Sequence, residues 1–271
     1  MRLISFLLCL IPINFCLSQQ EFFENKTEKQ LYNFNAFKAG EKLEYRLNYG
    51  FFNASYASLT LKDEVFDGKK VLRATSIGRT TGLARLFFKV DDIYETFFPK
   101  EKVKPVKSIR DIYEGGYERE AETIYDYKNN KALFYDKLKN IKKEFDIHPD
   151  IQDIISTFYY LRKHFDISSL KPNDLIYVDI FFDQEIYPFK MMFLGIERIK
   201  TKFGIVECMK LRPYMESGRV FRDNEGIKIW VTNDDNRVPI KVKADLRVGS
   251  IVANLVSFRG LANPFRIVVN E

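Results

Sequence analysis

The stretch near the C-terminal end reads Ile227-Lys-Ile-Trp-Val-Thr232, Asn233-Asp-Asp-Asn236, then Arg237-Val-Pro-Ile-Lys-Val-Lys-Ala-Asp-Leu-Arg-Val248. In the last segment every even position is apolar, from Val238 to Val248. Side chains along a strand alternate between two faces, so this pattern predicts a long strand with one buried face. Asn and Asp favour turns. The stretch therefore predicts an antiparallel hairpin, which continues across Gly249-Ser250 into a third strand carrying Ile251, Ala253 and Leu255.

The same alternation recurs through most of the chain, beginning with Leu43, Tyr45, Leu47 and Tyr49. It is interrupted by one helical stripe at 150–165, where the apolar positions follow a period of about 3.6 residues. Gly78 to Phe88 also breaks the rhythm, as a short helical turn or a loop with an apolar tip. The predicted fold is mainly β. We expect a large curved antiparallel sheet, an unclosed barrel that is continuous or divided into two lobes, with one main helix packed on it.

The N-terminus has the features of a signal peptide at 1–18. Arg2 precedes an apolar run from Leu3 to Phe15, and Ser18 is the expected cleavage position. The run is shorter than the ~20 residues that a membrane span needs, so we expect no transmembrane span in the mature chain. Lipidation at Cys16 is the disfavoured alternative, because Asn14 and Phe15 are larger than the residues that such processing requires.

These boundaries predict an exported protein, periplasmic or associated with an outer membrane. We expect a disordered leader at 19–36, a single β-rich domain at 37–262 and a C-terminal tail at 263–271. The mature chain would keep a single cysteine, Cys208, which excludes an intrachain disulfide and a cysteine-based metal site. Its strand context predicts a buried small side chain. The formal charge of +6 is compatible with anionic lipid surfaces and gives no indication of nucleic-acid binding.

The sequence contains no recognisable catalytic or cofactor-binding motif. Its two histidines, His148 and His164, have no partner at metal or catalytic spacing. Asp234-Asp235 suits a turn better than a calcium loop. Two carboxylate groupings, Asp91-Asp92 and Asp179 with Asp183 and Glu185, are explained more simply as solvated strand positions than as acid–base pairs. We therefore expect no catalytic residues, no metal and no cofactor.

The helix carries a polar set that predicts a structural network. Ser156 and Tyr160 are four residues apart, as are Gln152 and Ser156, so they share a polar stripe of the helix. Asp153 and Arg162 lie on opposite sides of the helix, so one of them must approach the buried face. We expect Asp153, Ser156 and Arg162 to tie the helix to the sheet rather than to anchor a ligand. Tyr117 and Trp230 are expected to be packing residues with a hydrogen-bonded polar tip.

Four stretches resemble an exported bacterial family, domain of unknown function 3108. They are Phe37-Lys-Ala-Gly-Glu-Lys-Leu-Glu-Tyr-Arg-Leu-Asn-Tyr-Gly50, Glu114-Gly-Gly-Tyr117, Asp153-Ile-Ile-Ser-Thr-Phe-Tyr-Tyr-Leu-Arg162 and Ile229-Trp-Val-Thr-Asn-Asp-Asp-Asn-Arg-Val-Pro239. The resemblance implies a β-rich envelope protein with no assigned activity. The closing Trp-Val, turn, Val-Pro-Ile pattern is more distantly similar to carriers of lipoproteins or lipids, which fold as unclosed barrels with helices against the concave face.

The first functional hypothesis is a non-enzymatic envelope protein that binds or carries a hydrophobic ligand, either a lipid, an acyl chain or an apolar protein segment. Its expected lining consists of the apolar residues Leu43, Tyr45, Leu47, Ile229, Ile240 and Val242. The alternative is a structural or assembly partner of an outer-membrane complex that docks through sheet edges or through Gly78 to Phe88. The least favoured hypothesis is a hydrolase that uses the carboxylates named above.

Overall fold

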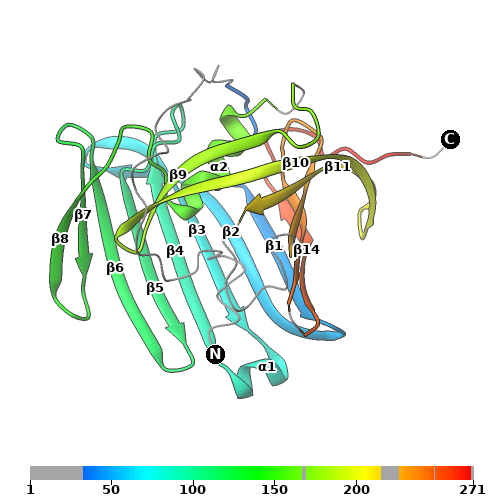
Figure 1. The fold of residues 1–271 in the computed structure, drawn as a ribbon, viewed down its shortest axis with the longest axis horizontal. Coiled ribbons are helices and arrows are strands. Elements are labelled where there is room, and N and C mark those ends of the chain that lie inside the picture. The colour runs from blue at the N-terminus through cyan, green and yellow to red at the C-terminus, as the bar shows by residue number, and fades with distance from the viewer. Residues whose placement is uncertain (1–32, 167–168, 215–225, 247, 270–271) are drawn as a thin grey trace.

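The computed structural model describes residues 33–166, 169–214, 226–246 and 248–269. Its strands form one 14-stranded sheet in the order β8-β7-β6-β5-β4-β3-β2-β1-β14-β13-β12-β11-β10-β9 (Figure 1). The strands are β1 (Lys42–Tyr49), β2 (Phe52–Phe66), β3 (Lys69–Thr80), β4 (Val90–Phe98), β5 (Lys107–Glu114), β6 (Tyr117–Asp126), β7 (Lys131–Asp136), β8 (Ile141–Asp146), β9 (Leu175–Phe182), β10 (Glu185–Thr201), β11 (Gly204–Tyr214), β12 (Ile227–Thr232), β13 (Pro239–Asp245) and β14 (Ser250–Arg259).

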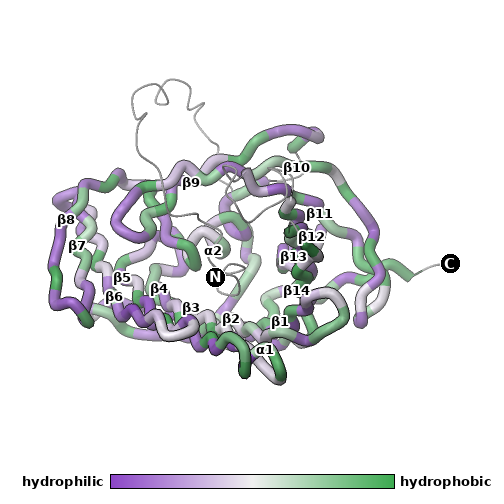
Figure 2. The backbone as a smooth tube through the Cα atoms, turned by 60° about the horizontal axis from the view of Figure 1, so that its bottom comes forward, coloured by the Kyte–Doolittle hydropathy of each residue, from purple (hydrophilic) through white to green (hydrophobic). Residues whose placement is uncertain are grey.

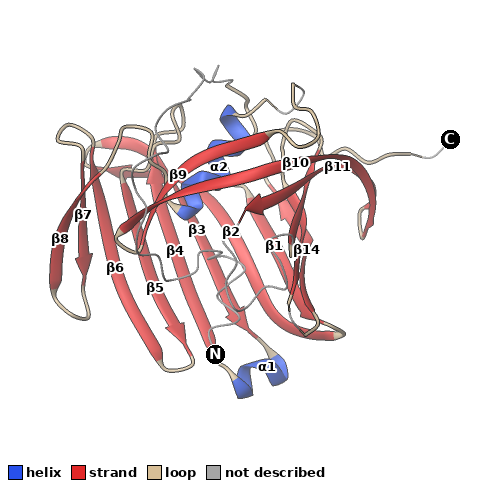
Figure 3. Ribbon diagram, in the orientation of Figure 1, coloured by secondary structure: helices blue, strands red, loops and turns tan. Residues whose placement is uncertain are grey.

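The sheet curves around the helix α2 (Ile154–His164), and β8 and β9 form its two edges (Figure 2). All the strand pairs are antiparallel, and a short second helix, α1 (Gly82–Phe87), lies outside the curve (Figure 3). The predicted fold class is therefore confirmed, with one continuous sheet rather than two lobes. Among the described residues, neither helix has the length and apolarity needed to cross a bilayer.

The two edges of the sheet are joined by the segment between β8 and α2, not by direct strand pairing. The Gln152 amide donates to the Asp179 carbonyl at 2.9 Å, and the Phe181 amide donates to the Gln152 carbonyl at 2.8 Å. Beside them, Phe181 packs edge-on against Tyr125 of β6. The curved sheet is thus held nearly closed by one short parallel bridge and an aromatic contact.

This bridge also explains why the helix begins later than the expected 150–165. The apolar period continues through Ile151, but Gln152 is engaged with β9 and so has an extended backbone. Asp153 then caps the helix: its side chain accepts from the Ser156 amide, and Ser156 Oγ accepts from the Asp153 amide. Such a capping box fixes the first turn at the residue that follows. The helix therefore spans Ile154–His164.

The expected hairpin forms, although its second strand is shorter than predicted. Asp234 Oδ1 accepts from the amides of Asn236 and Arg237, which extends the turn and leaves Arg237 at a φ of 52°. β13 therefore begins at Pro239 instead of residue 237. Val248, expected on the buried face, is 76% exposed because the chain turns between β13 and β14. The strand carrying Ile251, Ala253 and Leu255 is confirmed as β14, and all three side chains are buried.

Both ends of the domain pack more closely than their composition indicated. In the expected leader, the Phe34 amide donates to the Lys163 carbonyl and Ala36 is fully buried. In the expected tail, Phe265 stacks on Phe258, and the Val268 amide donates to the Ile205 carbonyl. The expected signal peptide at 1–18 and positions 19–32 lie outside the described residues.

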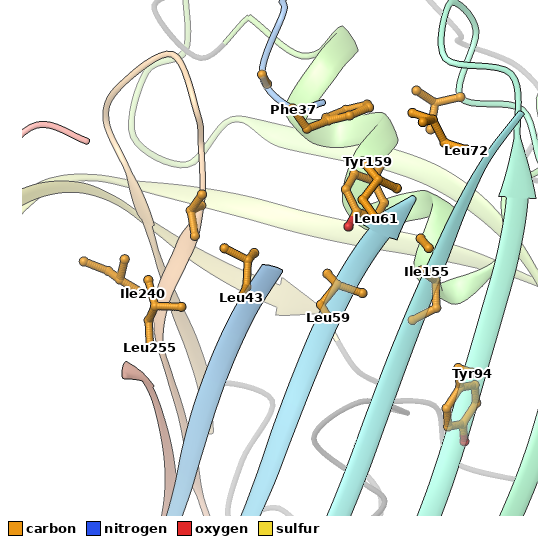
Figure 4. Packing of buried hydrophobic residues seen from close by; sticks show 14 of the residues in the cluster. Phe37, Leu43, Leu59, Leu61, Leu72, Tyr94, Ile155, Tyr159, Ile240 and Leu255 are labelled. Atoms are coloured by element: carbon orange, nitrogen blue, oxygen red, sulfur yellow. The ribbon is translucent and has the colours of Figure 1, made fainter. Parts of the chain in front are cut away.

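The main core lies between α2 and the concave face of the sheet (Figure 4). Tyr159 of the helix contacts the rings of Phe37 and Phe98 at centroid distances of 4.9 and 5.4 Å. Leu43 and Leu59, paired across β1 and β2, belong to the same cluster. Cys208 is buried within β11, as expected, and burial raises the pKa of its thiol to about 12. Packing of these apolar faces is the main source of stability.

Gly115, in the turn between β5 and β6, is required by a close approach. A Cβ at this position would lie 2.3 Å from the ring of Phe88, which follows α1, and the backbone φ is +55°. We expect Gly115→Ala to lower the free energy of unfolding by about 1–3 kcal/mol more than Gly50→Ala does. Gly50 is the matched control, because its φ is also +55° while a Cβ at that position would meet nothing within 4 Å. Urea unfolding of both variants measures this difference, and equal losses would contradict the prediction.

Candidate functional site

The six residues expected to line a ligand site lie on the face of the sheet that α2 covers in part. Leu43 packs in the cluster that contains Tyr159, and Tyr45 and Leu47 follow it at intervals of two along β1. Leu47 is paired with Ala253. Ala253 in turn is paired with Val242, and Val242 with Ile229. Paired residues share a face, so this row crosses β1, β14, β13 and β12 on the concave side. Ile240 lies two residues before Val242 on β13 and belongs to the main cluster.

One part of this face forms a separate apolar cluster, which we call the apolar floor. It consists of Leu47, Ala57 and Ala253, together with Tyr45 and Val242. None of its members belongs to α2, whose closest strands are β3, β4 and β9. The Tyr45 hydroxyl donates to the Pro239 carbonyl at 3.0 Å, so its polar tip is satisfied and its ring faces the cluster. Leu47, Ala57 and Ala253 are only 5–8% exposed, so the floor is a buried apolar patch, and Tyr45 links it to the main cluster that contains Tyr159.

The N-terminal end of α2 is fixed by Asp153. Besides capping the helix, Asp153 Oδ2 accepts a hydrogen bond of 2.5 Å from Thr96 of β4. Burial raises the pKa of Asp153 from 3.8 to about 6, although the hydrogen bonds from Ser156 and Thr96 act in the opposite direction. The cost of desolvating the charged carboxylate therefore exceeds the stabilisation that these hydrogen bonds provide.

The C-terminal end of the helix is fixed by Arg162, through different partners. Its guanidinium forms a two-pronged pair with Glu41 at 2.6 and 2.7 Å, and also donates to the carbonyls of Ala36 and Asn236. The side chains of Arg162 and Glu41 are 3% and 0% exposed. Arg162 thus joins the helix to the start of the domain and to the turn before β13. Asp153 and Arg162 are both buried, and they belong to separate networks at opposite ends of α2.

The two residues expected to be packing residues, Tyr117 and Trp230, differ in their burial. Tyr117 is 41% exposed at the start of β6, so it is not a buried packing residue. Trp230 is a buried packing residue, as expected: it is 5% exposed and belongs to the main cluster, and its pairing with Lys210 and Lys241 places it on the face opposite to Ile229. The two ammonium groups lie 5.5 and 5.0 Å from its ring, in cation–π geometry. Alternation along β12 separates these neighbours, because Ile229 and Trp230 are adjacent in sequence.

A small cavity lies beside the N-terminal end of α2. Its volume is about 30 Å³, which suits one or two water molecules and is far below the 300–1,000 Å³ usual for ligand pockets. Its walls come from β4 to β7, β9 and the helix, and include Tyr94, Ser108, Arg110, Thr123, Tyr125, Asp153, Phe181 and Asp183. This cavity therefore does not provide the site for an acyl chain.

The carboxylates considered for acid–base chemistry are held separately. Asp91 pairs with Arg85 on one face of β4, whereas Asp92 is buried on the other face and accepts from the Tyr113 amide. Asp183 is held by two arginines of neighbouring strands, Arg110 and Arg119. Within the described ranges, no group of three His, Cys, Asp or Glu side chains could hold a metal ion.

The residues 233–236 form the predicted turn, and their side chains connect distant segments. Asp234 accepts from Thr232 Oγ1, and Asn236 is bonded through its side chain to Asn263 and Pro264. Sequence reasoning missed Glu41 and Thr96, which complete the two helix anchors. A buried Glu in Gly40-Glu41 is indistinguishable in sequence from a surface Glu, and its partner Arg162 lies 121 residues away.

A comparison of the sequence with known families gives one match. The family model described as protein of unknown function (DUF3108) matches residues 44–256, which is most of the chain. The chain belongs to the DUF3108 family. This match includes three of the four stretches noted above in full, and the first in part. No match was found among curated proteins.

Comparison with solved structures supports the fold. A β-barrel-like protein of the domain of unknown function DUF1849 from Brucella abortus aligns with a TM-score of 0.51 at 9% identity, over 84% of this chain and 100% of the other. A DUF1089 family protein from Pseudomonas aeruginosa aligns at a TM-score of 0.39 and 12% identity, over 71% and 90% of the two chains. A candidate lipoprotein from Parabacteroides distasonis aligns at 0.32 and 12% identity, over 84% and 99%. The first of these shows that the unclosed, barrel-like sheet is shared.

Proposed function

We propose that this protein is a non-catalytic component of the bacterial cell envelope that binds a hydrophobic ligand along the apolar floor. The ligand class is an acyl chain of a lipid or lipoprotein. The observation that carries the proposal is the floor itself, a cluster of five apolar residues on the concave face that includes no residue of α2. Two of its members, Ala57 and Ala253, have short side chains that project little from the backbone.

The position of the floor suits an elongated apolar ligand. Its row of paired residues runs across four neighbouring strands, from Leu47 to Ile229. Beyond Ile229, a further buried cluster continues the apolar surface through Leu211 and Phe193. An extended hydrocarbon chain would bury apolar surface along this row at about 25 cal/mol per Å². The expected N-terminal signal is compatible with a place in the envelope.

Binding of a fluorescent fatty acid to the purified protein tests this function. We expect saturable binding that Val242→Asn weakens by about tenfold, because the half-buried Val242 side chain would lose its apolar contact with the ligand. Lys243→Asn is the matched control, since the next residue of β13 points to the opposite face and its change should leave the affinity unaltered. Absence of saturable binding, or equal affinity in Val242→Asn and the unaltered protein, would contradict the proposal.

The alternative role is an assembly partner of an envelope complex. Its proposed docking segment, Gly78 to Phe88, contains α1, and none of the residues of this helix is buried. Docking through the β8 edge is less favoured, because Lys142, Lys143 and Glu144 are exposed along that strand. Charged residues on an edge strand discourage pairing with another chain. Crosslinking in the envelope separates the two roles, since the ligand-binding role predicts trapped lipid and the assembly role predicts one trapped protein.

A further inference from the structure

The helix α1 presents its apolar side to solvent. Leu83, Leu86 and Phe87 are spaced by three and four residues, so they lie on one face of the helix. In a surface helix of a soluble domain such a face packs on the core. Here Leu86 is 81% and Phe87 86% exposed. α1 therefore has the sequence pattern of a helix that packs on a core, but its apolar face points to solvent.

Exposed apolar side chains continue from α1 into the two neighbouring turns. The turn between β1 and β2 carries Phe51 and Phe52, and Phe51 is fully exposed. The turn between β13 and β14 carries Val248, beside Tyr49 at the end of β1. β1 pairs with both β2 and β14, so these segments lie together at one end of the sheet (Figure 1). We call this set, Tyr49, Phe51, Phe52, Leu83, Leu86, Phe87 and Val248, the apolar rim.

The clustering at this end is not a general property of the surface. Eighteen large apolar side chains are exposed in the described residues, and ten of them lie at this end of the sheet. They are the seven residues of the apolar rim and three residues in or beside the turns that join β5 to β6 and β7 to β8, namely Tyr117, Leu138 and Ile141. At the opposite end of the same strands, Val65 is the one exposed large apolar residue of the described chain beside the turn between β2 and β3. Contiguous exposed apolar surface of this kind marks an interaction site.

Arg85 holds α1 in the orientation that exposes this face. Its guanidinium pairs with both carboxylate oxygens of Asp91 at 3.0 and 2.7 Å, and it also donates to the Val90 carbonyl. The hydrogen bond from Arg85 keeps the pKa of Asp91 below its ordinary value. On the other side, Phe88 packs over Gly115. The polar side of α1 is thus fastened to the sheet, and the apolar side is left outward.

Three cations gather around Asp91 beside α1. Arg79, Arg85 and Lys89 all approach Asp91, at 3.6, 2.7 and 3.6 Å. These three cations exceed the charge of Asp91 by two, while the carboxylates of Glu114 and Glu118 belong to the neighbouring hairpin at this end of the sheet. Apolar side chains at the tips of turns, flanked by Arg and Lys, match a bilayer surface with anionic headgroups.

We propose that the apolar rim is a membrane-docking surface that inserts into the interface of an anionic lipid bilayer. Leu86, Phe87 and Phe51 enter the acyl boundary, while Arg79 and Lys89 contact the lipid headgroups. A bilayer is a better match than a second copy or a protein partner, because the rim is formed by separate turn tips flanked by cations. The inference stands independently of the acyl-chain site, although the floor lies on the same strands: Leu47 of the floor is two residues from Tyr49 of the rim.

Sedimentation with lipid vesicles tests the proposal, using the exported protein and vesicles of phosphatidylcholine with or without one fifth phosphatidylglycerol. We expect binding to the anionic vesicles that falls at least about tenfold in the variant Phe51→Ser/Leu86→Ser/Phe87→Ser. The variant Arg79→Gln/Lys89→Gln should lose about fivefold or more on anionic vesicles and little on neutral ones. These side chains are on the surface, so circular dichroism of each variant should match the unaltered protein.

Val65→Ser is the matched control, because Val65 is an exposed apolar residue at the opposite end of the sheet, and it should bind vesicles like the unaltered protein. All these proteins share the same N-terminal segment, so differences between them report on the rim alone. Equal vesicle binding by the triple variant and the unaltered protein would overturn the proposal. So would a failure of the unaltered protein to bind anionic vesicles, which would favour a protein partner at this surface. Neither result bears on fatty-acid binding, which the Val242→Asn experiment measures separately.

Discussion

Replacing Arg162 with alanine is expected to lower the free energy of unfolding by about 3–5 kcal/mol. The guanidinium is buried and makes four hydrogen bonds, two with Glu41 and two with the carbonyls of Ala36 and Asn236. Its removal would leave the carboxylate of Glu41, which is fully buried, without a partner charge. Desolvation of an unpaired charge is far more costly than loss of an exposed ion pair. Urea unfolding followed by circular dichroism measures the change.

Two further variants make this result interpretable. Arg198→Ala removes an exposed pair with Glu207, at 62% and 38% side-chain exposure, and should cost no more than about 1 kcal/mol. The double variant Arg162→Met/Glu41→Leu removes both charges and should recover most of the stability lost in Arg162→Ala, because no buried charge remains unpaired. A loss in Arg162→Ala no greater than in Arg198→Ala would show that the buried pair does not stabilise the helix end.

The fold was predictable because it depends on periodicity. The alternation of Val238 to Leu246 predicts a strand with one buried face. In the structure β13 covers most of this stretch, and the side chains of Val238, Ile240, Ala244 and Leu246 are buried. The apolar spacing near Ile155 and Tyr159 likewise predicts the helix against the sheet. These patterns are local, and each is repeated along its element, so a few irregular residues do not obscure them.

The helix anchors were only half predictable, because each joins residues that are distant in sequence. Asp153 and Ser156 are three residues apart and follow a helical signature. Thr96 is 57 residues from Asp153, and Glu41 is 121 residues from Arg162. Sheet order brings these partners together, and single-sequence reasoning supplies no such order. Trp230 shows the same limit: its neighbours in sequence gave no sign that it is paired with Lys210 and Lys241 of the adjacent strands.

The apolar rim illustrates a different limit. Composition gave Gly78 to Phe88 an apolar tip, and the helix α1 confirms it. The sequence could not show that Phe51 and Val248 lie at the same end of the sheet, because β1 pairs with β14 across 200 residues of chain. Nor could it show that Arg85 fastens the polar side of the helix to the sheet. The physical cause is the same in both cases, since a surface is assembled from segments that only the sheet brings together.

The second large effect is a pH dependence that Asp153 introduces. Burial raises the pKa of this carboxyl from 3.8 to about 6 in the folded protein. A group whose pKa is raised by folding contributes stability that is fully present below the unfolded value and is lost as the pH rises through the folded value. The contribution of Asp153 is therefore present below pH 4 and lost between about pH 4 and pH 6. The change corresponds to at most about 3 kcal/mol, at 1.36 kcal/mol per pKa unit.

Asp153→Asn should remove this dependence. Asparagine is also a good helix N-cap and can accept from the Ser156 amide, so the variant keeps the start of α2 and carries no charge to desolvate. We expect it to unfold at nearly the same urea concentration as the unaltered protein at pH 4 and at a higher one at pH 7. Asp126→Asn is the control of opposite sign: hydrogen bonds from Asn129 lower the pKa of Asp126, so its removal should destabilise at pH 7. A difference between Asp153→Asn and the unaltered protein that stays constant from pH 4 to pH 7 would show that Asp153 does not titrate in this window.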